Sequence, residues 1–152
     1  MTEEIGNFLK ALHVLGAVVW VGGMFFALFV LRPSLGLLPP AQRLTLHRAV
    51  FARFFKIIWH AMPIVLLTGY GLVFGVFGGF AMVDPSVHVM HAIGIAMAAI
   101  FAFIFFWPWA AMRTAVAAGD APGAALAAER VRKLVLANLV LGVATIVIAA
   151  FA

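Results

Sequence analysis

Four long apolar stretches constrain this chain more than any other feature. They run over about residues 11–31, 57–77, 87–109 and 134–151. Because an α-helix needs about 20 apolar residues to cross the hydrocarbon core of a bilayer, each stretch predicts one transmembrane helix. Hydrophobic residues make up 66% of the sequence and charged residues only 10%. A composition so apolar excludes both a water-soluble globular domain and a disordered chain.

The connections between these stretches predict one all-α domain over residues 1–152, an antiparallel four-helix transmembrane bundle. Residues 32–56 are typical of a short amphipathic interfacial piece leading into a helix that begins before the membrane does. Residues 114–129 are small and predict a flexible, turn-forming connection. Asp84-Pro85 predicts the start of the third helix, since proline is tolerated in the first turn.

The basic residues predict how the bundle is oriented. Of the ten Lys and Arg residues, nine lie between the first and second stretches (residues 32–56) or between the third and fourth (residues 110–133), and only Lys10 lies on the other side. The positive-inside rule then places both termini in the periplasm of a bacterial inner membrane. The net charge of +5 is explained by this topology and by anionic lipid, so no nucleic-acid partner is expected. The N-terminal MTEEIGNFLK lacks the features of a signal peptide, and the first helix is expected to be retained.

The residue types that are missing narrow the chemistry. The chain has no cysteine, which excludes disulfides, thiolate zinc sites and iron–sulfur clusters. The five acidic residues lie in connections or at helix ends and form no pair within an apolar stretch. Hydrolytic catalysis is therefore not expected, and no catalytic residue is assigned.

Histidines are the candidate functional residues, because an ionisable side chain inside a membrane is costly. His13 lies just inside the outer end of the first stretch, and His88 and His91 lie at the outer end of the third. His88 and His91 share a helix face, and all three are expected at similar depth. His60 lies near the cytoplasmic boundary. His47 lies in the basic connection and is expected to be solvated.

The diagonal arrangement of the first and third helices predicts a cofactor between them. Adjacent helix axes in a bundle lie about 8–10 Å apart, so imidazoles on two diagonal helices can reach one cofactor. On each of the two helices, small residues lie on the same face as the histidine. They include Gly16 on the first helix, with Trp20 near it, and Gly94 on the third. We therefore predict a b-type haem held by His13 and His91, with His88 as the alternative second ligand. The same glycines are also common in plain helix packing.

A haem at this place predicts one-electron transfer, with a quinone or a periplasmic redox partner. The protein would then be a haem-dependent membrane oxidoreductase. In this interpretation Trp20 and Tyr70 are packing or electron-path residues. His60 would serve quinone or proton handling, or a second haem if the same side offered another ligand. Glycine-rich lipid-facing surfaces are compatible with a homodimer.

Copper is the alternative to haem at this place. Thioethers select Cu(I), and the chain has seven methionines. The sequence His88-Val89-Met90-His91 places a methionine between two histidines. A copper site would use these three side chains and His13, with His60 as a further candidate ligand. Methionine also fills irregular cores, so a structural or partner-binding subunit is the third hypothesis.

Three segments resemble known membrane families. FLKALHVLGAVVWVGGMFFALFVLRPSL resembles the first helix of CopD-type copper-resistance domains and of HemJ-type haem-biosynthesis proteins. The shared features are a Leu-His-Val start, a tryptophan half-way and a basic or proline-containing end. HAMPIVLLTGYGLV resembles the second helix of both groups. RVRKLVLANLVLGVATIVIAAFA resembles the CopD-type fourth helix.

The resemblance carries over only a few residues. His13 matches the first-helix histidine of both groups, and His88 matches a third-helix histidine in a His-Val-Lys pattern of HemJ-type proteins. Met90 stands in place of that lysine, which argues against the porphyrinogen-oxidising activity of that group. The HemJ-type likeness implies b-type haem, and the CopD-type likeness implies copper uptake across the inner membrane.

Overall fold

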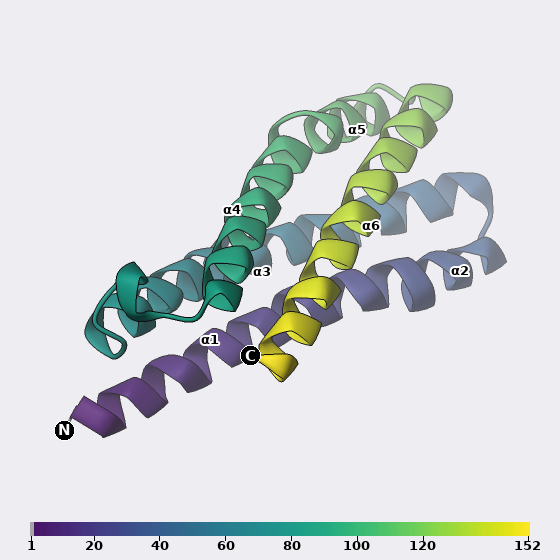
Figure 1. The fold of residues 1–152 in the computed structure, drawn as a ribbon. Helices are drawn as coiled ribbons and strands as arrows, with labels where there is room; N and C mark the ends of the chain where they lie inside the picture. Colours follow the sequence, from purple (N-terminus) through teal and green to yellow (C-terminus); the bar gives the residue numbers. More distant parts are fainter. Residues whose placement is uncertain (1) are drawn as a thin grey trace.

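A computed structural model describes residues 2–152, which form helices and no strand (Figure 1). The long helices are α1 (Thr2–Phe26), α3 (Pro40–Gly75), α4 (Pro85–Phe106) and α6 (Ala121–Phe151). The shorter elements are η1 (Ala27–Leu31), α2 (Arg32–Ser34), η2 (Leu35–Leu37), η3 (Phe80–Met82) and α5 (Pro108–Ala117). Four helical segments are long and apolar enough to cross a membrane. The predicted all-α, multi-pass membrane architecture is therefore confirmed.

The helices pack as two antiparallel pairs. α1 lies along α3, and α4 lies along α6 (Figure 1). α1 also contacts α6, whereas α3 and α4 touch little, and α1 and α4 are diagonal as predicted. We call the end where α1 begins, η3 lies and α6 ends the terminal end. The opposite end, with α2, η2 and the α5–α6 turn, is the basic end.

Side-chain caps fix where two helices begin. Asp84 Oδ1 accepts a hydrogen bond from the backbone N–H of Ser86 at 2.8 Å, and Pro85 occupies the first turn of α4, as predicted. The same N–H lowers the pKa of the Asp84 carboxyl. Asp120 Oδ1 accepts from the N–H of Gly123 at 2.9 Å and caps α6 in the same way.

The expectation of a flexible connection over residues 114–129 is wrong. α5 continues to Ala117 and α6 begins at Ala121, so the turn is only three residues long. Gly119 takes φ +70°, a backbone angle that suits glycine, and this closes the turn. The alanines after it favour helix and pack as part of α6, which explains why small residues did not mean flexibility here.

α3 is longer than a membrane is thick. Its 36 residues extend about 54 Å, against about 30 Å of hydrocarbon. The basic side chains Arg43, Arg48, Arg53 and Lys56 occupy its first half. The membrane span predicted for α3, which begins at about residue 57, leaves this basic half outside the hydrocarbon.

The densest core lies toward the basic end. Phe55 is its centre, with ring centroids 5.8 Å from Phe101 and 5.3 Å from Trp109. Trp20 reaches the same cluster through Phe101 at 6.4 Å and so links the diagonal helices α1 and α4. Toward the terminal end, inward-facing side chains such as His13 and His91 are only half-buried. The histidines thus lie where the bundle is more open.

Candidate functional site

His13 is held by α3 in one tautomer. Its Nδ1 lies 2.9 Å from the Val65 carbonyl oxygen and 3.2 Å from Thr68 Oγ1. A carbonyl can only accept, and the Thr68 hydroxyl already donates to the Ile64 carbonyl at 2.5 Å. The Nδ1 atom of His13 therefore donates, which leaves Nε2 as an acceptor. Metal-binding histidines are commonly oriented by a carbonyl in this way.

Glycines let α1 and α3 approach closely around His13. A Cβ atom at Gly69 would lie 3.1 Å from the Cε1 atom of His13, so the imidazole rests on the bare backbone there. A Cβ atom at Gly16 would lie 2.7 Å from a Val65 methyl group. Gly16 thus serves helix packing in this structure. At Gly94 a Cβ would meet nothing within 4 Å.

A second cluster joins α3, η3 and α4 at the terminal end. The ring of Phe80 lies 5.5 Å from the His88 ring and 5.0 Å from the His91 ring, between centroids. The Tyr70 hydroxyl lies 3.4 Å from Nε2 of His91. His88 is exposed and His91 half-buried. We call Tyr70, Phe80, His88 and His91 the Phe80 cluster.

The remaining sequence candidates lie apart from these two groups. His60 is exposed, and its Nδ1 donates to the Lys56 carbonyl of its own helix at 2.8 Å. Trp20 is 3% exposed and belongs to the core. Across residues 2–152, no three side chains of the His, Cys, Asp and Glu types form a metal-binding group. A metal site here would need fewer such ligands or a methionine donor.

Comparison with known proteins identifies the family. The family model named CopD, Copper resistance protein D, matches residues 48–152. This chain belongs to the copper resistance protein D family. The match includes His60, His88, Met90 and His91, whereas His13 precedes it. No curated protein and no solved structure matches the chain significantly.

In this CopD-family protein the donor types near the Phe80 cluster suit copper. Imidazole is a common copper ligand, and thioether is a soft donor that selects Cu(I). Met90 lies between the two histidines and is half-buried, and Met82 on η3 is exposed. Phe80 is the residue that the sequence analysis missed. Its position depends on the fold of residues 76–84, and no periodic pattern indicates it.

The prediction that His47 is solvated is wrong. Its side chain is buried, with 9% exposure, and its ring lies 4.6 Å from that of Phe51. η2 folds back over the start of α3 and covers it, because Arg43 bonds to the Leu35 carbonyl. Burial and, to a smaller extent, the Arg32 guanidinium together lower the pKa of His47 to about 4.

Proposed function

We propose that this CopD-family protein binds Cu(I) at the terminal end of the bundle, as the first step of copper uptake across a bacterial inner membrane. The observation that carries the proposal is the placement of His88 and His91 against one ring, Phe80. Both histidines lie in the region that matches the family. Two imidazoles on successive turns of one helix face can ligate the same ion.

The neighbouring groups support a soft cation at this place. Met90 offers a thioether on the same helix. The Tyr70 hydroxyl, 3.4 Å from Nε2 of His91, can accept from the Nε2–H group, which would leave Nδ1 as the ligand atom. The buried methionines Met24, Met97 and Met112 lie in the core. Their thioethers supply further soft donors between the Phe80 cluster and the basic end.

Anaerobic titration with Cu(I) against a chromophoric chelator tests the proposal. The detergent-solubilised protein is expected to withdraw one Cu(I) per chain from the competitor. Zn²⁺, which prefers four harder or anionic ligands, is expected not to displace it. A protein that leaves all the Cu(I) on the chelator contradicts the proposal.

A b-type haem is the second candidate, and the tautomer of His13 favours it. The Nδ1 hydrogen bond to Val65 leaves Nε2 available to ligate a haem iron. His13 and His91 would hold the group, which supplies one-electron redox chemistry when bound. The Trp20–Phe101 contact closes the bundle centre below that level, so the haem would occupy only the terminal end.

The His13→Ala variant separates the two candidates. Copper binding is expected to stay within about 2-fold of the parent protein, since the His13 ring rests on Val65 and Gly69 rather than on Phe80. A haem protein would instead show a Soret band that shifts with dithionite and is lost in His13→Ala. Absorption spectra and Cu(I) titrations of both proteins measure the difference. A Soret band that needs His13 would favour the haem candidate.

A further inference from the structure

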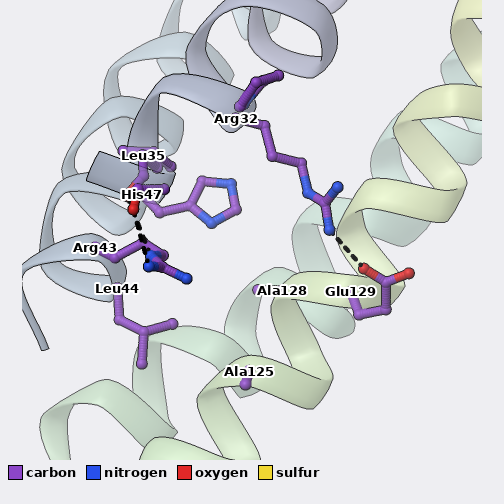
Figure 2. A pocket seen from close by; sticks show the side chains of 10 residues that line it. Arg32, Leu35, Arg43, Leu44, His47, Ala125, Ala128 and Glu129 are labelled. Atoms are coloured by element: carbon purple, nitrogen blue, oxygen red, sulfur yellow. Dashed lines mark hydrogen bonds and ion pairs between the residues drawn. The ribbon is translucent and has the colours of Figure 1, made fainter. Parts of the chain in front are cut away.

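A pocket of about 440 Å³ opens at the basic end (Figure 2). The Phe80 cluster lies at the opposite, terminal end of the bundle. Its walls come from α2 and η2, from the first turns of α3 and from the start of α6. Ala125 and Ala128 line the α6 side, and their small side chains leave the space open. Its polar side chains are Arg32, Arg43, His47 and Glu129.

His47 points into this pocket with its ring nitrogens unpaired. Figure 2 shows the imidazole directed into the space between Arg32 and Arg43. Its ring lies 4.6 Å from that of Phe51, and it makes no hydrogen bond within residues 2–152. Its nitrogens face the open pocket, where a ligand or water can complete their hydrogen bonds.

Arg43 is a rigid part of the wall. Its Nε donates to the Leu35 carbonyl at 3.1 Å, and one terminal nitrogen donates to the carbonyls of Gly36 and Leu38. These bonds use three of its five N–H groups. The other terminal nitrogen has no partner among residues 2–152 and can donate two hydrogen bonds to a ligand.

Arg32 is free to exchange its partner. It contacts Glu129 Oε2 at 3.2 Å, in an exposed ion pair. Both oxygens of Glu129 also accept from Arg132, by Nε at 2.8 Å and by a terminal nitrogen. Glu129 therefore keeps both hydrogen bonds from Arg132 when Arg32 turns to another anion. Because the Arg32–Glu129 ion pair is exposed, breaking it costs little free energy.

We propose that this pocket binds a phosphate ester anion, such as the headgroup phosphate of an anionic phospholipid. Two guanidinium groups on different segments, together with a buried imidazole, match the geometry of a phosphate group. The pocket lies where the apolar α1 segment ends, at headgroup level, and Leu37 beside it is 89% exposed. Arg32, Arg43 and His47 all precede the family-matched region, so this site is independent of the copper proposal.

The test uses the full chain in phosphatidylcholine vesicles that contain spin-labelled phosphatidylglycerol. Arg32→Gln and Ala125→Leu are expected to weaken association of the labelled lipid about 5-fold, by loss of one charge contact or by filling the pocket. Glu129→Gln is expected to strengthen it, since Arg32 is then released. Arg53→Gln removes the same charge from an exposed position outside the pocket and is expected to change association less than 2-fold.

Inorganic phosphate, added at constant ionic strength, distinguishes the source of the ligand. Failure of phosphate to displace the labelled lipid assigns the site to a headgroup. If phosphate displaces the labelled lipid from the parent protein but not from Arg32→Gln, the site is assigned to a soluble phosphate. If Arg53→Gln weakens association as much as Arg32→Gln does, the attraction is general surface charge and the proposal is overturned. Ala125→Leu with full binding and native helicity overturns it as well.

Discussion

Replacing His88 and His91 together with alanine is expected to weaken Cu(I) binding by at least about 100-fold, or about 2.7 kcal/mol. Both imidazoles lie against Phe80, and their removal leaves only thioethers at this end of α4. Each single variant is expected to lose less, because the other imidazole remains. The measurement is competition with a chromophoric Cu(I) chelator in detergent.

His60→Ala is the matched control for the double variant. His60 is also a histidine of the family-matched region, but it is exposed and bonds only to its own helix. The His60→Ala variant is expected to bind Cu(I) with an affinity within about 2-fold of that of the parent protein. An equal loss in His60→Ala and in His88→Ala/His91→Ala would mean that copper binds to histidines without a defined site.

Phe55→Ala is expected to lower the free energy of unfolding by about 3 kcal/mol. Phe55 is 1% exposed, and its ring contacts aromatic side chains of α3, α4 and α5. Lipid is as apolar as the core, so the loss arises from packing and the cavity rather than from transfer out of water. Reversible unfolding in SDS, followed by circular dichroism, measures the difference.

Phe8→Ala makes the same truncation on the outside of the bundle. Phe8 is 63% exposed and is expected to change the unfolding free energy by less than about 0.5 kcal/mol. If both variants lose the same stability, the aromatic cluster around Phe55 is not the centre of the core.

Apolar length and local signals predicted most of the fold. Each predicted span falls on one of the four membrane-length helical segments, although the second, 57–77, runs two residues past the end of α3 at Gly75. Asp84-Pro85 begins α4 as expected. These features depend on neighbouring residues, which a sequence displays directly. A turn was predicted within residues 114–129, but not the helix on both sides of Gly119, because the alanines there fit both a flexible connection and a helix. Packing of α6 against α4 and α5 stabilises the helical conformation of these residues.

The candidate sites depended more on contacts between distant segments. The sequence indicated His13, His88 and His91, but not that Val65 would fix the tautomer of His13. Phe80 joins the two α4 histidines only because η3 folds back toward them. The burial of His47 likewise follows from η2 covering α3, a contact that no periodicity displays.

X-ray absorption at the copper K-edge of the Cu(I)-loaded protein shows directly whether His88 and His91 ligate the ion. A Cu(I) edge with the outer-shell scattering of imidazole rings is expected. That scattering should be lost in the double variant of His88 and His91 and retained in His13→Ala. A spectrum with sulfur scattering alone, unchanged by the double variant, would contradict it.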